Sequence, residues 1–227
     1  MHKTTRLLAL IALSAIAANA LAERTPARFG TGEDSLPSKI EFPELKGDTT
    51  VTLRCASLAE ENGKLEMNGC YVENPADQLF SAAVIDGADH ARVQPAVADG
   101  KEQRVYLQYR VEFTKKGEEE TVNVYPNPGV QENIDAYGQA HVAAQRVVGK
   151  EKWQDICPEN VAYVLWLKAH VAPDGTASNF SLAHSSGLNP PPRCHQAILD
   201  TVSSSLFFPA LSDGEPVPST YVEPFGN

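Results

Sequence analysis

Pro209-Ala210-Leu211-Ser212-Asp213-Gly214-Glu215 has a near-copy 114 residues earlier, Pro95-Ala96-Val97-Ala98-Asp99-Gly100-Lys101. Two other landmarks recur in the same order and at nearly the same spacing. They are Glu61-Asn62-Gly63 with Asp174-Gly175, and Tyr109-Arg110-Val111-Glu112-Phe113 with Tyr221-Val222-Glu223-Pro224-Phe225. Solenoid repeats are only about 20–50 residues long, so this spacing predicts a duplicated domain instead. We interpret both copies of the opening stretch as the corner that leads from a helix into a final strand.

The C-terminal half has the alternation of apolar and polar residues that is typical of a strand. Its apolar stripe consists of Val161, Tyr163, Leu165, Leu167, Ala169 and Val171. Pro173-Asp174-Gly175 predicts a turn, followed by a return strand over 176–185. Apolar residues at three- and four-residue steps predict an amphipathic helix over 194–206, after the prolines at 190–192. A last strand is expected over 217–225, and Pro216 and Pro218 confine its start to a sheet edge or bulge.

The N-terminal half repeats this order. Strands are expected over 49–58 and 65–72, then a helix opened by Asn74-Pro75, then a strand over 104–113 with clean alternation. An extra strand over 121–125 pairs back on the last one. The apolar parity changes between Leu65 and Cys70, which predicts a bulge near Asn68-Gly69. The fold class is therefore α+β: two tandem β-β-α-β modules, each an antiparallel sheet of three or four strands with one helix packed on a face.

The four cysteines fall two in each half, and we expect two disulfides within the modules, which are typical of an oxidising compartment. Cys55 and Cys70 lie nearly opposite each other across the hairpin that turns at Glu61-Asn62-Gly63. The second pair is Cys157 and Cys194. A zinc site is the alternative, but the spacing contains no Cys-x-x-Cys or His-x-x-x-His element.

The N-terminus has the features of a secretory signal peptide. Lys3 and Arg6 precede an apolar run from Leu7 to Ile16, and Ala20-Leu21-Ala22 supplies the cleavage pattern. An uncleaved membrane anchor is the alternative, although the run is shorter than the roughly 20 residues that span a bilayer. Cleavage after residue 22 removes two of 19 basic residues and none of 29 acidic ones, so the mature chain carries a formal charge of −12. The signal predicts a periplasmic or secreted protein without a stable membrane anchor in its mature form. The acidic balance favours solubility and argues against nucleic acid as a partner.

Domain bounds follow from these patterns. We expect a signal peptide at 1–22, an irregular N-terminal arm at 23–46, module 1 at 47–125, a linker at 126–154 and module 2 at 155–227. Residues 132–148 predict a connecting helix that is entered from Pro126-Asn127-Pro128-Gly129. Its candidate packing residues are Ile134, Tyr137, Val142, Ala144 and Val148.

Several ordered motifs of the second half resemble the TonB C-terminal domain. They are the string from Val164 to Gly175 (VLWLKAHVAPDG), Ser185-Ser186-Gly187, a helix, Phe208-Pro209-Ala210, Asp213-Gly214-Glu215-Pro216-Val217 and a closing aromatic strand. The resemblance covers about residues 155–227, and residues 47–125 look like a diverged relative. It implies a periplasmic protein that grips an extended peptide of an outer-membrane transporter. Because a cleavable signal stands where that family has an anchor helix, and the Pro-rich spacer is missing, we expect peptide binding without energy transduction.

The resemblance places the peptide on the last strand, at Ser219, Thr220, Tyr221, Val222 and Glu223. An open sheet leaves unpaired N–H and C=O groups along such an edge, and an extended peptide can add there as a further strand. The alternative is that the two prolines before this strand protect it from pairing. The expected partner is thus a protein or peptide of the cell envelope.

Catalysis is not expected, and neither a cofactor nor a metal ion is predicted. His184-Ser185-Ser186 and Cys194-His195 are the only combinations that invite a nucleophile, yet a disulfide-bonded Cys194 cannot act as one. No base and orienting acid can be named for either serine. The histidines are scattered, and Trp153 and Trp166 are expected to pack, Trp166 on the face opposite the apolar stripe. A structural envelope protein without a peptide ligand is one rival function, and a hydrolase or an inhibitor is another.

Overall fold

The computed structural model describes residues 24–226 and combines several antiparallel sheets with few helices. The predicted signal peptide lies outside the described residues. The strands are β1 (Arg24–Thr25), β2 (Arg28–Phe29), β3 (Thr49–Ala59), β4 (Leu65–Tyr71), β5 (Val93–Gln94), β6 (Ala96–Ala98), β7 (Lys101–Gln103), β8 (Val105–Lys116), β9 (Glu119–Tyr125), β10 (Gln145–Val147), β11 (Tyr163–Val171), β12 (Ala177–Gly187), β13 (Phe207–Phe208), β14 (Ala210–Ser212), β15 (Glu215–Val217) and β16 (Ser219–Gly226). The helices are α1 (Leu36–Lys39), α2 (Gln78–His90), α3 (Gln131–Tyr137) and α4 (Pro192–Ser203), with 3-10 turns η1 (Pro75–Asp77) and η2 (Lys152–Asp155).

The larger sheet, which we call the N-terminal sheet, has six strands in the order β13-β10-β8-β3-β4, with β9 also paired to β8. The sequence predicted at most four strands here. The additional ones are β10, from the linker, and β13, from the C-terminal half, so both halves of the chain contribute to this sheet. Alternation puts one face of β8 in the core, where Val105, Leu107, Tyr109, Val111 and Phe113 are all buried. Helix α2 packs on that face through Phe80, Val84 and Ala88.

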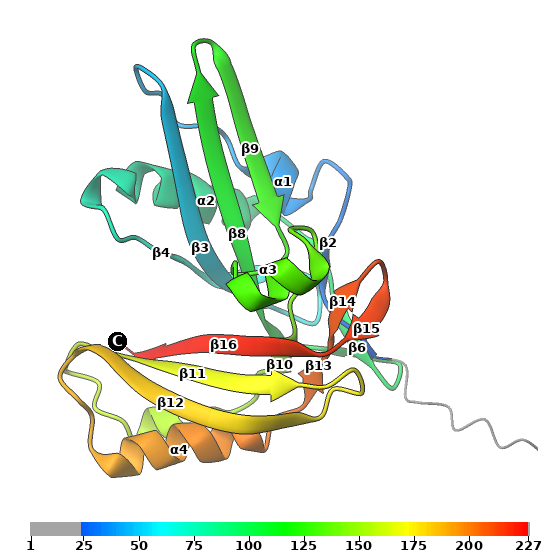
Figure 1. Ribbon diagram of the computed structural model, residues 1–227, viewed down its shortest axis with the longest axis vertical. Coiled ribbons are helices and arrows are strands. Elements are labelled where there is room, and N and C mark those ends of the chain that lie inside the picture. Colours follow the sequence, from blue (N-terminus) through cyan, green and yellow to red (C-terminus); the bar gives the residue numbers. More distant parts are fainter. Residues whose placement is uncertain (1–23, 227) are drawn as a thin grey trace, which may run out of the picture.

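The C-terminal sheet has three strands in the order β12-β11-β16, all antiparallel. Helix α4 lies along one face of it, and β16 lies on the side toward the N-terminal sheet (Figure 1). The predicted apolar stripe of β11 is buried against α4 through Leu165, Leu167 and Val171, together with Ile198 and Val202 of the helix. Trp166 belongs to the opposite face, as its parity predicted.

Both predicted disulfides are present. Cys55 and Cys70 are directly opposed in the β3–β4 register, and Cys157 joins the segment before β11 to Cys194 of α4. The predicted bulge is also confirmed, because the β3–β4 register shifts between Ala56 and Leu58 and Met67 has a φ of 50°. Two disulfides are typical of proteins in an oxidising, extracytoplasmic compartment.

The two copies of the repeated stretch have the same local structure. Each forms a two-stranded hairpin, β6–β7 and β14–β15, between a helix and a long strand. The turn residues have positive φ in both: 53° and 71° at Asp99 and Gly100, and 51° and 87° at Asp213 and Gly214. Positive φ at both central residues defines the type I′ hairpin turn, which the Asp-Gly pair favours. The stretch therefore has a turn function in both places.

Strand registers also recur along the chain. The corresponding partners are Thr25↔Val97 and Val142↔Leu211, Arg28↔Gln94 and Gln145↔Phe208, Phe29↔Val93 and Arg146↔Phe207, Cys55↔Tyr109 and Leu167↔Glu223. In the first three correspondences, the first residue of the later pair lies 117 positions after that of the earlier pair, and the second residue lies 114 positions after its counterpart. In the last correspondence these spacings are 112 and 114. The segment 24–29 thus occupies the same place beside one hairpin that 141–146 occupies beside the other.

The linker is less helical than its sequence predicted. Helix α3 ends at Tyr137, because Gly138 follows with a φ of 78°. The chain turns at 139–140 instead of continuing the helix to 148, and β10 then pairs with β8 on one side and β13 on the other. The extended conformation of β10 is favoured over a helix because it provides hydrogen-bond partners for the N–H and C=O groups of two neighbouring strands.

The N-terminal arm packs against the rest of the molecule. It is mostly irregular, as expected, but it also holds β1, β2 and α1, and Ala27, Leu36 and Ile40 are buried. The side-chain amide of Gln145 fastens it, accepting from the Ala27 N–H and donating to the Ala27 carbonyl, both at 2.8 Å.

Candidate binding groove

An open groove runs between the two sheets. It consists of two adjoining clefts of about 620 and 580 Å³ that share Met67, Tyr106 and Pro224 in their walls. We call them the first cleft and the second cleft. The first reaches the linker at Glu151 and Trp153, and the second reaches it at 128–131. Each cleft has a volume within the range of ligand-binding clefts, and together they extend along the space between the sheets.

The walls of the second cleft come from the sheet faces that carry no helix. Arg54, Tyr71 and Gln108 project from the N-terminal sheet, on the side away from α2. Trp166, Val222 and Pro224 project from the C-terminal sheet, on the side away from α4. The wall from the N-terminal sheet is open to solvent, since Tyr71 is 54% exposed and Met67, also on β4, is 75% exposed.

The predicted edge strand β16 forms the rim of this groove on its outer side. Strand alternation directs the outer backbone groups of Thr220, Val222 and Pro224 away from β11. Asn133 of α3 occupies the first of them: its side-chain amide accepts from the Thr220 N–H at 3.0 Å and donates to the Thr220 carbonyl at 2.8 Å. Gln108 donates to the Val222 carbonyl at 2.7 Å. We call these contacts of Asn133 and Gln108 the amide clasp. The two outer groups that follow it, the Val222 N–H and the Pro224 carbonyl, have no hydrogen-bond partner among residues 24–226.

Three of the five predicted edge residues have buried side chains. Ser219, Tyr221 and Glu223 point to the α4 side of the sheet and are at most 3% exposed. Val222 lines the second cleft and Glu223 lines the base of the first, whereas Thr220 lines neither. The edge prediction therefore concerns the outer backbone of β16 together with Val222.

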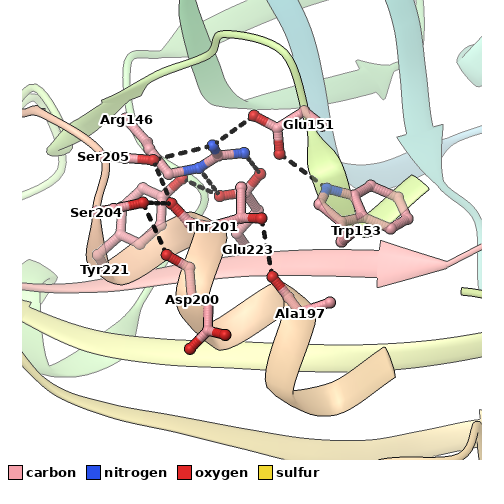
Figure 2. Close-up of polar contacts among 10 residues, drawn as sticks. All are labelled: Arg146, Glu151, Trp153, Ala197, Asp200, Thr201, Ser204, Ser205, Tyr221 and Glu223. Carbon is pink, nitrogen blue, oxygen red and sulfur yellow. Dashed lines mark hydrogen bonds and ion pairs between the residues drawn. The ribbon is translucent and has the colours of Figure 1, made fainter. Parts of the chain in front are cut away.

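A buried polar cluster joins β10 to β16 at the base of the first cleft (Figure 2). Arg146 donates from Nε and Nη2 to both carboxylate oxygens of Glu223, at 2.8 and 2.7 Å, and from Nη1 to Glu151 at 2.9 Å. The Tyr221 hydroxyl donates to Glu223 at 2.5 Å, and Trp153 Nε1 donates to Glu151 at 2.8 Å. Each charge therefore has a partner, which buried charges require.

The environment of this cluster fixes its protonation state. Burial first, and then the Glu223 carboxylate, raise the pKa of Tyr221 well above its usual value. Burial would lower the pKa of Arg146, but the charge and the hydrogen bonds of Glu223 outweigh it and raise that pKa. A neutral tyrosine and a charged arginine then surround Glu223 throughout the physiological range. This arrangement supports a positioning contact between strands.

The residues that were considered as catalytic candidates do not form a catalytic arrangement with one another. Cys194 is bonded to Cys157, and His195 follows it on α4 with a buried Nε2 that has no hydrogen-bond partner. His184 contacts the Gly187 carbonyl at 3.2 Å, whereas Ser185 and Ser186 are exposed. Across residues 24–226, His, Cys, Asp and Glu side chains form no group of three that could hold a metal ion.

Sequence reasoning missed the groove and the buried cluster. Trp153 and Trp166 were expected only to pack, yet each lines a cleft while Trp153 also stacks edge-on against Phe225. One signal was available: Glu223 shares the inward parity of Tyr221 and Phe225, so an inward carboxylate needed a buried cation. Arg146 was hidden in the stretch that was predicted as helix.

No protein-family model, no curated protein and no solved structure matches the chain. The helices in residues 24–226 are all too short or too polar to cross a membrane.

Proposed function

We propose that this chain is a non-catalytic protein-binding component of the cell envelope that holds an extended segment of another envelope protein in the groove beside β16. The observation that carries the proposal is the groove itself, an open trough with the exposed Tyr71 on one wall and the half-buried Trp166 on the other. Aromatic anchors in a preformed groove are typical of protein-recognition sites. No cofactor enters this function.

We also propose that the chain consists of two tandem β-β-α-β modules and is exported through a cleaved signal at 1–22 into the periplasm. The paired hairpins and the recurring registers support the duplication. The two disulfides support export. The resemblance to the TonB C-terminal domain makes an outer-membrane transporter the expected partner.

A second candidate is a structural envelope protein without a peptide ligand. The amide clasp favours it, because Asn133 and Gln108 already satisfy three of the outer backbone groups of β16. Pro224 also lacks the N–H that a continuous ladder needs. Edges that are covered or interrupted in this way resist strand addition.

Capture of envelope proteins by the mature chain, followed by binding measurements with the purified partner, distinguishes these functions. The Trp166→Ala and Tyr71→Ala variants should each weaken binding at least about tenfold if the groove holds the partner. Leu188→Ala is the matched control, since Leu188 is 65% exposed and lies outside both clefts.

The outcomes separate the alternatives. Lysine substitutions at Thr220 and Val222 that leave the affinity unchanged would exclude main-chain pairing at the edge. Equal capture by wild type and both groove variants would refute the proposed site. A cell-wall or lipid component as the captured species would support the structural alternative, and a proteolytic enzyme would support an inhibitor.

A further inference from the structure

One cation in the groove has no counter-charge. Arg54 is the only charged residue that lines the second cleft, which contains no Asp or Glu. It is exposed, and its guanidinium forms no ion pair or hydrogen bond with any residue of 24–226, while its backbone pairs with the strands on either side. A single arginine in a trough of aromatic and apolar side chains is a ready contact for an anion, because the surrounding low-dielectric surface strengthens the attraction.

The neighbouring arginines show that this is an exception. Arg104 of the first cleft pairs with Glu60 at 2.5 Å, and Arg146 pairs with Glu223 and Glu151. Arg110 faces Arg54 directly in the β3–β8 register, but it pairs with Glu112 at 3.2 Å and stacks on Tyr125. Of the arginines that line the two clefts, Arg54 is the one without an ion pair to any residue of 24–226.

The surroundings of Arg54 define what else the ligand must carry. Tyr71 lies opposite Arg54 in the β3–β4 register, and Trp166 and Pro224 stand on the other wall. These surfaces favour apolar side chains on either side of the anion. The net negative charge of the protein repels a run of acidic residues, so a single carboxylate is favoured over an acidic tract.

We propose that the second cleft binds an extended protein segment in which one carboxylate contacts Arg54 and the flanking apolar residues pack on Tyr71 and Trp166. The carboxylate belongs to an Asp or Glu side chain or to a chain terminus. A guanidinium can bind it with two parallel hydrogen bonds. This inference rests on the proposed function and specifies the chemistry of the partner.

A library of synthetic octapeptides, offered to the immobilised mature protein, tests the proposal. One half of the library ends in a free carboxylate and the other in an amide. Wild type should retain peptides that have one carboxylate between apolar residues, and the two halves reveal which source is used. Arg54→Gln should weaken binding of these peptides about tenfold or more, whereas Arg54→Lys should retain part of it.

Arg193→Gln is the control, because Arg193 is exposed on α4 and lies outside both clefts. The Arg54→Glu variant should instead retain peptides that contain Lys or Arg.

Two results would overturn the inference and leave groove binding intact. They are retention of peptides without a carboxylate by the wild type, and retention of the same peptides by Arg54→Gln as by the wild type. A wild type that retains no peptide and captures no groove-dependent partner would remove the proposed function as well. Dimerisation of wild type that Arg54→Gln abolishes would assign the cleft to a second copy of the chain.

Discussion

The two halves of the chain have a side-chain contact at the same structural position, but the contact is an aromatic pair in the N-terminal half and an ion pair in the C-terminal half. In the N-terminal half, Phe29 of β2 packs edge-on against Tyr109 of β8, with ring centroids 5.8 Å apart. In the C-terminal half, Arg146 of β10 forms two hydrogen bonds with Glu223 of β16. Arg146 follows Phe29 by 117 residues and Glu223 follows Tyr109 by 114, the spacings at which the strand registers recur.

The difference shows what each contact contributes. The aromatic pair gains free energy from apolar burial and tolerates small shifts. The ion pair must offset a large desolvation cost, and it does so only when all of its hydrogen bonds form together. We therefore expect the polar version to specify how β10 lies against β16, and so the shape of the first cleft, more than it adds to stability.

Removal of the arginine should have the largest effect. Arg146→Met leaves the buried Glu223 and the half-buried Glu151 without a cation, which should cost about 3–5 kcal/mol in the free energy of unfolding. Glu223→Gln should cost less, because Arg146 keeps Glu151 at 2.9 Å. Urea unfolding followed by Trp fluorescence measures both.

Lys168→Met is the matched control, since its partner Glu132 and Lys168 itself are 51% and 57% exposed. Loss of that pair should change stability by less than about 1 kcal/mol. An Arg146→Met variant as stable as this control would mean that the buried cluster is not a required contact.

The sequence predicted the parts of this comparison that depend on local pattern. Alternation gave β3, β8 and β11, and the cysteine positions gave both disulfides. It did not predict β10, because the stretch from Gln145 to Val147 becomes a strand only when β8 and β13 offer their edges. The groove was equally hidden, since it depends on how the linker sets one sheet against the other.

The asparagine and glutamine contacts illustrate the same limit. Asn133 and Gln145 each bind the N–H and the C=O of one distant residue, 87 and 118 positions away. Nothing in the periodicity of α3 or β10 marks these side chains as substitutes for a neighbouring strand. Glu223 is different, because its inward parity could have been recognised as a demand for a buried cation.

The two tyrosines at these positions provide the next test. At neutral pH, Tyr221→Phe removes a hydrogen bond to a charged carboxylate and should cost about 1.5–3 kcal/mol, against about 0.5–1.5 kcal/mol for Tyr109→Phe. The difference follows from the partners, because Tyr109 shares its bond at 3.1 Å with the neutral Ser57 hydroxyl. Denaturant unfolding at pH 7 measures both variants, and equal costs would contradict the contrast between the halves.

Alkaline pH extends this test. Burial raises the pKa of Tyr109 to about 12. Between pH 10 and that value the unfolded chain has lost a proton that the folded chain retains, so stability falls as pH rises, by up to about 1.4 kcal/mol per unit for each such tyrosine. Tyr109→Phe and Tyr221→Phe should each make the slope between pH 10 and 11 shallower, by up to about one proton. A slope unchanged by Tyr221→Phe would contradict its burial beside Glu223.

Replacing the ion pair of the C-terminal half with the aromatic pair of the N-terminal half should have the smallest effect on stability. It is also the most direct test of the comparison. A triple variant, Arg146→Phe, Glu223→Tyr and Glu151→Gln, gives the C-terminal half the aromatic pair of the N-terminal half and removes the third charge. Replacing a buried charged triad with apolar residues is often neutral or stabilising, so its stability should lie within about 1.5 kcal/mol of wild type. Because the orienting hydrogen bonds are lost, partner binding through the first cleft should weaken even though the fold is kept. A triple variant as unstable as Arg146→Met would show that the two positions are not interchangeable, and unchanged binding would show that the ion pair has no part in shaping the groove.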